Sequence, residues 1–348
     1  KLFKKKILGK DISCFYLSSG TTDESKIIQY QNKSMVNGQI ALIKSKFTKK
    51  KPIHLCFLPF GHTSVLRYSI KHCICLGGKI IIFESYWKIK NNLWNVVKKF
   101  NVTYFQTVPT ILKSILTIGN KPPSLKTIKF IGCGSAYLDK KIQKDFEYKF
   151  KVKVSNLYGL SETGATHFDD PFFKNRKVGS IGMPLAGVTC KILHKKKLTN
   201  KKNVEGVIMI KNNFSLFGYY KNKNKLFYNG YFKTGDIGKF SEDGFLYYED
   251  RMKDIIIKGG VNLLPSEIEN VISKISGVKE VAIKSYKHDF FGEDICCHAV
   301  INKKKITELK ILKICRLKLG EFKTPSKFLY YKKLPRTASG KILKRYLK

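Results

Sequence analysis

Short apolar runs alternate with amphipathic stretches between residues 79 and 150 of this chain. Lys79–Phe83 and Thr103–Thr107 have the length and composition of buried strands, and Leu125–Gly132 is a further apolar run that ends at a glycine. The stretches that separate and follow these runs have the apolar spacing of helices and cover residues 93–100, 110–118 and 139–150. Val108-Pro109 is expected to break the chain between a strand and a helix. Repeated strand–helix alternation is typical of a layered α/β domain.

Two further regions have other patterns. From Gly179 to Tyr248, short apolar runs alternate with glycine turns, which predicts a β-rich subdomain. After Asp250–Asp254 the pattern returns to strand and helix, with an Ile255–Ile257 strand and a helix opened by Pro265. The second pattern predicts a compact α/β unit at the end of the chain.

The Asp250–Asp254 boundary predicts two domains. We expect residues 1–252 to form a large layered α/β domain with its β-rich subdomain, and residues 253–348 to form a small mobile α/β domain. In the small domain, Gly259-Gly260 predicts a tight turn. Ser266–Glu269 has the Ser-x-x-Glu form of a capping box, which predicts that the Ser266 side chain caps the start of this helix.

The chain is strongly basic, with 67 Lys and Arg against 25 Asp and Glu and a formal net charge of +42. Lysine occurs along the whole chain in short scattered runs, so we expect no specific nucleic-acid interface, only salt-dependent attraction of polyanions. No apolar run approaches the ~18 residues that a membrane span needs, and we expect no transmembrane segment.

The nine cysteines have no regular spacing and are odd in number, which argues against a disulfide framework. Cys73-Ile74-Cys75 beside His72, and Cys296-Cys297-His298, contain residue types that bind metals. Both lie in apolar, strand-like surroundings, where buried free cysteine is common. We therefore expect structural thiols in a chain that works in the reducing cytoplasm.

Five short signatures follow one another along the chain in a fixed order. They are Ser18–Thr22, Tyr158–Thr163, Thr234–Asp236, Asp250–Asp254 and Pro335–Lys341. One such signature can arise by chance, whereas five in this order over most of the chain are not expected to.

The residue types in these signatures suit a nucleoside triphosphate. Ser18–Lys26 combines hydroxyls, a glycine and a lysine in a loop that can hold phosphate oxygens, although it lacks the Walker A spacing. Glu162 offers a hard oxygen ligand of the kind that Mg²⁺ prefers. Asp236 can accept two ribose hydroxyls. Arg251 and Lys341 provide a planar fork of donors and a point charge for ribose or phosphate oxygens.

Taken together, these motifs resemble the adenylate-forming (AMP-binding) superfamily, and most closely its acyl-CoA synthetases. The resemblance runs from about Ser18 to the end of the chain. Members of the superfamily carry a large segment before the Ser-Gly-Thr-Thr loop, which begins here after 17 residues. We therefore expect a chain that lacks the first part of the large domain.

The resemblance implies a nucleotide site in the large domain. The implied nucleotide-binding residues are Ser18, Ser19, Gly20, Thr21, Thr22 and Lys26 for phosphates, Gly134, Ser135, Ala136, Tyr158 and Gly159 around adenine, and Ser161 at the α-phosphate. Glu162 is expected to hold Mg²⁺, and His62 to line the acyl pocket. Asp23 and Ser25 stand where the family has glycine and proline, so we expect weaker handling of pyrophosphate.

The resemblance also implies roles for residues near the domain boundary and beyond it. Asp236 and Arg251 are expected at the ribose and phosphates, and Lys253 at the hinge. Gly259-Gly260 would face the incoming thiol. Lys341 would bridge the substrate carboxylate and the α-phosphate as the principal catalytic residue.

The activity implied is ATP-dependent activation of a carboxylic acid, expected to be a fatty or other acyl acid. Acyl-AMP and pyrophosphate form first, and the acyl group then passes to CoA or to the phosphopantetheine of an acyl carrier protein. Two alternatives stay open: adenylation of an amino or aryl acid for a carrier protein, and a catalytically silent nucleotide-binding remnant. The sequence leaves the acid and the oligomeric state open.

Overall fold

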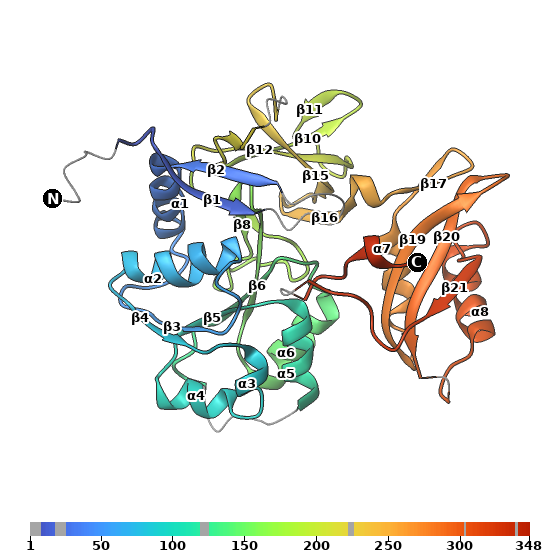
Figure 1. Ribbon diagram of the computed structural model, residues 1–348, viewed down its shortest axis with the longest axis horizontal. Coiled ribbons are helices and arrows are strands. Elements are labelled where there is room, and N and C mark those ends of the chain that lie inside the picture. Colours follow the sequence, from blue (N-terminus) through green and yellow to red (C-terminus); the bar gives the residue numbers. More distant parts are fainter. Residues whose placement is uncertain (1–7, 18–25, 119–124, 222–225, 303, 338–339) are drawn as a thin grey trace. The chain divides into compact units, whose positions relative to one another are not determined.

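The computed structural model describes residues 8–17, 26–118, 125–221, 226–302, 304–337 and 340–348. The chain divides into two units (Figure 1). The first comprises residues 1–234, 239–248 and 338–340, and the second comprises residues 235–238, 249–337 and 341–348.

A mostly parallel sheet forms the centre of the first unit. Its strands are β3 (Ile53–Cys56), β4 (Lys79–Ile82), β5 (Tyr104–Thr107), β6 (Phe130–Gly134), β7 (Val154–Leu160), β8 (Gly164–Phe168) and β9 (Met183–Pro184). They lie in the order β4-β3-β5-β6-β7-β8-β9. Neighbours from β4 to β7 run parallel, and β8 and β9 are added antiparallel.

Helices cover both faces of this sheet. They are α1 (Asn32–Lys44), the π-helical η1 (Val65–Lys71), α2 (His72–Cys75), α3 (Tyr86–Ile89), α4 (Leu93–Lys99), α5 (Pro109–Ile118) and α6 (Lys140–Phe150). Phe105 and Ile131 share one core cluster with residues of α4, α5 and α6, which follow one another along that face (Figure 1). Their sequence neighbours Tyr104 and Phe130 pack in a second cluster with residues of α1 and η1. Because successive strand residues point to opposite faces, both faces are buried.

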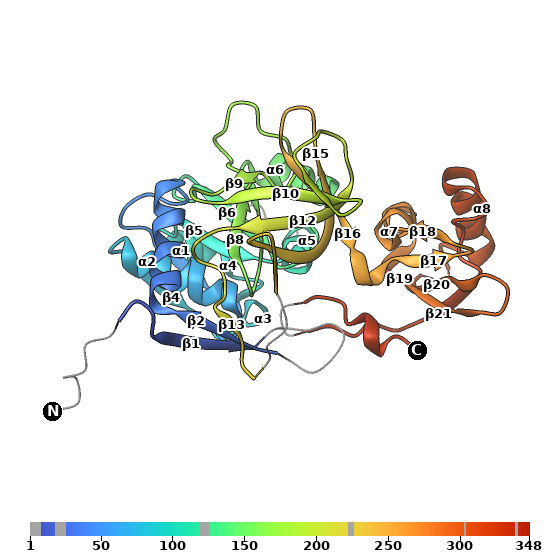
Figure 2. The same cartoon turned by 90° about the horizontal axis from the view of Figure 1, so that it is seen from above.

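Two smaller sheets complete the first unit. Strands β1 (Ile12–Leu17), β2 (Ile27–Gln31) and β13 (Gly218–Tyr219) lie side by side (Figure 2). The other sheet contains β10 (Thr189–His194), β11 (Lys197–Thr199), β12 (Gly206–Lys211), β14 (Phe227–Tyr228), β15 (Tyr231–Phe240) and β16 (Leu246–Arg251). Part of β15 and the end of β16 belong to the second unit.

The second unit is built on one sheet with helices packed against it. Its strands are β17 (Ile256–Lys258), β18 (Val261–Leu263), β19 (Val278–His288), β20 (Gly292–Ile301) and β21 (Lys327–Tyr330), and its helices are η2 (Met252–Asp254), α7 (Pro265–Ile272), α8 (Glu308–Leu319) and η3 (Lys344–Tyr346). Ile283, Ile295 and Cys297 of the sheet share a core with apolar residues of α7 and α8. Gly259 and Gly260 join β17 to β18 with φ of +52° and +80°, as a two-residue hairpin turn requires.

The expected α/β class is confirmed, with local corrections. The expected break between β5 and α5 lies at Val108, and the helix begins one residue before the expected residue 110, at Pro109, whose missing N–H costs nothing there. The strand expected to end at Gly132 continues to Gly134. The segment around Cys73 lies on helix α2 rather than on a strand.

The expected capping box at Ser266 is wrong. Helix α7 begins at Pro265, as expected, but its N-cap residue is Leu264, which makes no side-chain hydrogen bond. The backbone N–H of Ser266 instead donates to Oδ2 of Asp250 at 2.8 Å. A carboxylate from the preceding strand therefore replaces the local serine, and it also places negative charge at the positive end of the helix.

All nine cysteines are free thiols. His72 beside Cys73 bonds through Nε2 to the hydroxyl of Thr48 at 3.0 Å, and His298 beside Cys297 bonds through Nδ1 to the hydroxyl of Tyr331 at 3.0 Å. Within the described part of the chain, no helix has the length and apolar content needed to cross a membrane.

Buried histidines make the first unit sensitive to acid. Burial lowers the pKa of His54 to about 4, and burial with the charge of His54 lowers the pKa of His72 to about 4. His54 uses Nδ1 to bond the carbonyl of Ser69 at 2.9 Å, while its Nε2 is buried without a partner among the described residues. A proton on either ring therefore adds an uncompensated charge to the core.

We predict that the free energy of unfolding falls as the pH is lowered from 6.5 towards 4. In this range the unfolded chain binds more protons than the folded chain, because the ordinary histidine pKa is 6.5 and that of folded His54 is about 4. His54 alone accounts for about 3 kcal/mol at most. Urea unfolding across this range should show a smaller pH dependence for His54→Gln than for the wild type. The control His194→Gln, on β10, should keep the wild-type dependence, and equal slopes for both variants would contradict the prediction.

Candidate active site

The carboxyl end of β6 is shaped by glycines. A Cβ on Gly132 would overlap the hydroxyl of Tyr104, and one on Gly134 would lie 2.6 Å from the carbonyl oxygen of Leu157. Packing against the neighbouring strands therefore requires glycine at both positions, whether or not a ligand binds at the strand end. Ser135 follows with a left-handed φ of +66°, and both Ser135 and Ala136 are exposed.

The end of β7 and the turn that follows it contain four of the expected site residues, Tyr158, Gly159, Ser161 and Glu162. Gly159 lies against the partner strand so closely that a Cβ would overlap the carbonyl oxygen of Gly164. Tyr158 is half-buried with its ring 6.0 Å from that of His167. The hydroxyl of Ser161 lies 3.2 Å from that of Thr63, which follows His62. The structure thus brings Ser161 next to the segment that carries His62.

Glu162 is held by a tyrosine from another sheet. Its Oε1 accepts a hydrogen bond from the hydroxyl of Tyr219 at 2.9 Å. Burial, reinforced by the Glu162 carboxylate, raises the pKa of Tyr219, so the phenol stays a donor at neutral pH. Lys26 lies with its Nζ 5.2 Å from the centre of the Tyr219 ring. Lys26, Glu162 and Tyr219 therefore form one cluster, which we call the Glu162 cluster.

His62 is fixed by its own turn. Its Nδ1 lies 2.6 Å from the hydroxyl of Ser64 and accepts the Ser64 backbone N–H at 3.3 Å. Nδ1 is therefore unprotonated, and Nε2 carries the proton of the neutral ring. Burial lowers the pKa of His62, which favours that neutral form.

Asp236 and Arg251 are paired with each other. Nε of Arg251 lies 2.7 Å from Oδ1 of Asp236, whose side chain is only 2% exposed. Asp236 lies on β15 and Arg251 ends β16, so neighbouring strands hold the pair. A carboxylate has about four lone-pair sites, so one that is paired in this way can accept further hydrogen bonds.

Lys341 lies close to this pair in the second unit. Burial, together with the positive charge of Arg251, lowers the pKa of Lys341 to about 8, and the Asp236 carboxylate opposes that shift. Its backbone N–H donates to the hydroxyl of Thr337 at 3.0 Å, and its carbonyl accepts the Thr337 N–H at 2.8 Å. Lys253 is exposed on η2, and Gly259-Gly260 is exposed at its hairpin turn.

Residues Ser18, Ser19, Gly20, Thr21 and Thr22 lie outside the described residues. Three residues that contact the expected site had not been singled out from the sequence. They are Tyr30, whose hydroxyl donates to the carbonyl of Ser161 at 2.6 Å, Thr63 and Tyr219. The chain contains 18 tyrosines, and no pattern in the sequence distinguishes Tyr30 and Tyr219 from the others.

The family assignment rests on sequence comparison together with this fold. The family described as "AMP-binding enzyme" matches residues 3–220, and "AMP-binding enzyme C-terminal domain" matches residues 267–341. The chain belongs to the AMP-binding enzyme family.

Relatives in this family are CoA ligases. The chain is 30% identical to the long-chain-fatty-acid–CoA ligase of Bacillus subtilis, over 97% of this chain and 61% of the relative. It is 26% identical to the marinolic acid–CoA ligase of a Pseudoalteromonas species, over 100% of this chain and 56% of that protein. The chain thus spans less than two thirds of the length of these relatives.

A solved structure supports the same assignment. The O-succinylbenzoate coenzyme A synthetase of Bacillus subtilis, in complex with ATP and a magnesium ion, matches with a TM-score of 0.87 at 26% identity. The match covers 98% of this chain and 70% of that one.

The steric role of Gly159 can be tested in this AMP-binding family member. We predict that Gly159→Ala destabilises the first unit by about 1–3 kcal/mol, because the added Cβ overlaps backbone that cannot rotate away. Gly218→Ala is the matched control, since a Cβ at Gly218 meets nothing within 4 Å. Urea unfolding should place the control within about 0.5 kcal/mol of the wild type. A Gly159→Ala protein as stable as the control would show that the two strands can separate at no cost.

Proposed function

We propose that this chain activates a carboxylic acid with ATP and then transfers the acyl group to a thiol. The observation that carries the proposal is the Glu162 cluster, in which Tyr219 orients a carboxylate, lies beside a lysine, and holds the residue that follows Ser161. Family membership supports it, as do the relatives that are CoA ligases. Fatty acids are one candidate class, because one relative is a long-chain-fatty-acid–CoA ligase.

The residues present fit a magnesium ion that is bound together with nucleotide. Glu162 provides one carboxyl oxygen ligand, and Tyr219 orients it. Among the described residues, no group of three or more His, Cys, Asp or Glu side chains could enclose a metal. Mg²⁺ usually takes one or two carboxylates and completes its shell with water and substrate phosphates. When bound, the ion would neutralise charge on the phosphates.

The first half-reaction is an in-line displacement. A carboxylate oxygen of the acid attacks the α-phosphorus of ATP, the bond from that phosphorus to the bridging oxygen breaks, and pyrophosphate leaves. Lys341 would bridge the carboxylate and the α-phosphate, and Ser161 would donate to the α-phosphate. Catalysis would consist mainly of positioning and charge stabilisation.

Other residues would hold the nucleotide and the acid. Tyr158 and the backbone of Gly134–Ala136 and Gly159 would contact adenine, and Asp236 and Arg251 would contact the ribose. Lys26 and the Ser18–Thr22 loop would contact the outer phosphates. Neutral His62 would line the acyl pocket.

The second half-reaction would need movement about Lys253. The segment after Lys253 would turn, withdraw Lys341 and bring Gly259-Gly260 to the site. A thiol of CoA, or of the phosphopantetheine of an acyl carrier protein, would then attack the acyl carbon, and AMP would leave. We place the domain boundary at 252/253. We place the enzyme in the cytoplasm, since nine free thiols suit a reducing compartment.

The test of the first step is acid-dependent exchange of labelled pyrophosphate into ATP. We predict exchange with one class in a panel of fatty, aryl and amino acids, and a loss of about 100-fold or more in Lys341→Ala, the usual cost of removing one preorganised donor. Lys333→Ala removes an equally charged but exposed lysine and should keep the wild-type rate. Bound ATP with no exchange for any acid would favour a silent nucleotide-binding remnant. Exchange retained in Lys341→Ala would remove Lys341 from the mechanism.

The hinge is tested by separating the two steps. We predict that Lys253→Pro keeps pyrophosphate exchange but loses most thioester formation, because proline fixes φ at the residue that must rotate. Lys253→Ala is the control, since it removes the same charge and leaves the backbone free. Both steps should be measured on the same preparation, by exchange and by thiol-dependent release of AMP. Equal loss of both steps in Lys253→Pro would count against the hinge.

A further inference from the structure

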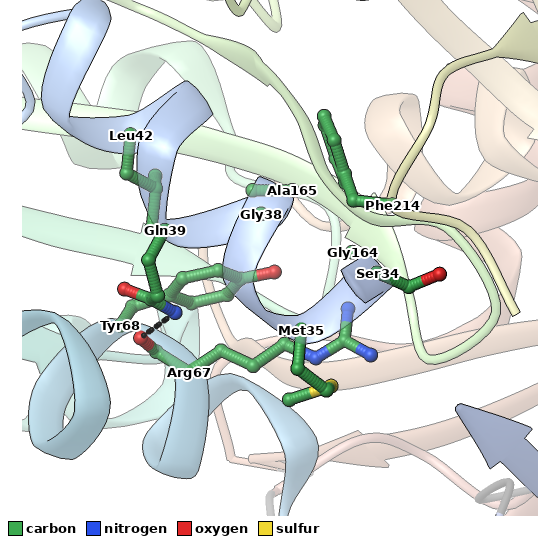
Figure 3. A pocket seen from close by; sticks show the side chains of 10 residues that line it. All are labelled: Ser34, Met35, Gly38, Gln39, Leu42, Arg67, Tyr68, Gly164, Ala165 and Phe214. Atoms are coloured by element: carbon green, nitrogen blue, oxygen red, sulfur yellow. Dashed lines mark hydrogen bonds between the residues drawn. The ribbon is translucent and has the colours of Figure 1, made fainter. Parts of the chain in front are cut away.

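A small cavity lies in the first unit next to the β7–β8 turn. It is lined by residues of α1, η1 and the start of β8, and by Phe214 (Figure 3). The space open to the centre of a water-sized sphere is about 20 Å³. A single water occupies about 10–15 Å³ by this measure, so the cavity has room for one small ion or about two waters.

The cavity contains a buried positive charge with no counter-charge. Arg67 is only 6% exposed, and its Nε and Nη2 have no hydrogen-bond partner among the described residues. Its guanidinium lies 4.2 Å from the ring centre of Tyr30 and 5.2 Å from that of Tyr16. Tyrosines attract the cation with their rings, and Tyr30 also hydrogen-bonds it, but a neutral phenol carries no charge to balance it. A buried ionised group normally has a charged or hydrogen-bonding partner.

Arg176 shows what such a partner looks like in this chain. It is also buried, and it bonds the carboxylates of Asp169 and Glu147 at 2.6 and 2.8 Å. No equivalent carboxylate lies among the residues that line the Arg67 cavity. Arg176 therefore has the carboxylate partner that a buried cation needs, and no residue that lines the cavity gives Arg67 one.

Helix α1 (13 residues) contributes no negative charge to the cavity. Ser34 and Met35 line the cavity from the first turn, which contains no acidic residue. The N–H groups of Asn32 and Lys33 donate to the carbonyls of Asp11 and Gly9 at 3.0 Å, so the donors that remain for an anion are those of Arg67. In Figure 3 the Arg67 guanidinium points towards Ser34 and Gly164, while the Gln39 amide lies at the other end beside the Arg67 carbonyl.

We propose that this cavity binds one monovalent inorganic anion of about the size of chloride, held by Nε and Nη2 of Arg67 at the first turn of α1. The volume excludes nucleotides and is too small for larger oxyanions such as sulfate. Gly164 touches the guanidinium, since a Cβ there would lie 2.6 Å from Nη1, and it stands two residues after Glu162. Through Arg67 and Gly164, the anion would stabilise the β7–β8 turn. The proposal does not depend on the proposed enzymatic activity.

Bromide is the probe, because it resembles chloride and has an anomalous X-ray signal. Crystals of the whole chain grown or soaked in bromide should show an anomalous peak within hydrogen-bond distance of Nε and Nη2. In solution, bromide should replace methanesulfonate at constant ionic strength, so that screening of the net charge of +42 stays the same. The melting temperature should rise by about 3 °C when bromide reaches about ten times its dissociation constant.

Two variants separate this site from general attraction of anions to a basic protein. Arg67→Gln should lose the bromide-dependent shift, whereas Arg316→Gln, which removes the same charge from the exposed face of α8, should keep it. A shift retained in Arg67→Gln overturns the proposal, and so does a wild-type crystal with no anomalous peak in the cavity or with water there. If Arg67→Gln does not fold, the wild-type diffraction experiment decides alone.

Discussion

The parallel sheet of the first unit determines where the candidate site residues that follow its strands lie. Strands β3 to β7 run parallel, so their carboxyl ends meet at one edge. His62 follows β3, Ser135 follows β6 and Ser161 follows β7. Three segments far apart in the sequence thus reach the same edge, which is where ligands bind in open α/β sheets. Because both faces are covered by helices, this edge is where the sheet can receive a ligand.

The residues that orient the site come from outside this sheet. Tyr30 of β2 bonds the Ser161 carbonyl across 131 positions of sequence, and Tyr219 of β13 bonds Glu162 across 57. β2 and β13 are neighbours in the three-stranded sheet, so one small sheet carries both tyrosines. The three-stranded sheet therefore holds the Ser161–Glu162 turn in place, although the sequences of β2 and β13 contain no catalytic signature.

The elements that depend on interactions between neighbouring residues could be predicted from the sequence. The helix over residues 140–150 was expected from its apolar spacing, and its N-cap Asp139 accepts the N–H groups of Lys141 and Ile142. The Gly259-Gly260 turn likewise follows from glycine's access to positive φ. Helix α2 was missed because a short apolar run has no period that separates strand from helix. The capping box failed because the competing acceptor, Asp250, lies 16 positions upstream. The contacts of Tyr30 and Tyr219 could not be predicted for the same reason: each depends on a partner brought near only by the fold.

The scarcity of acidic residues explains how charge is arranged in the interior. With 67 basic and 25 acidic residues, most cations cannot have a carboxylate of their own and must remain in water. Two buried cations have a carboxylate beside them: Lys258 lies 2.6 Å from Asp294, and Arg176 lies 2.6 Å from Asp169. Arg67 differs from both, with tyrosine faces in place of a carboxylate. A mobile anion from solution would satisfy the same electrostatic requirement without a further acidic residue, in a chain that has few to spare.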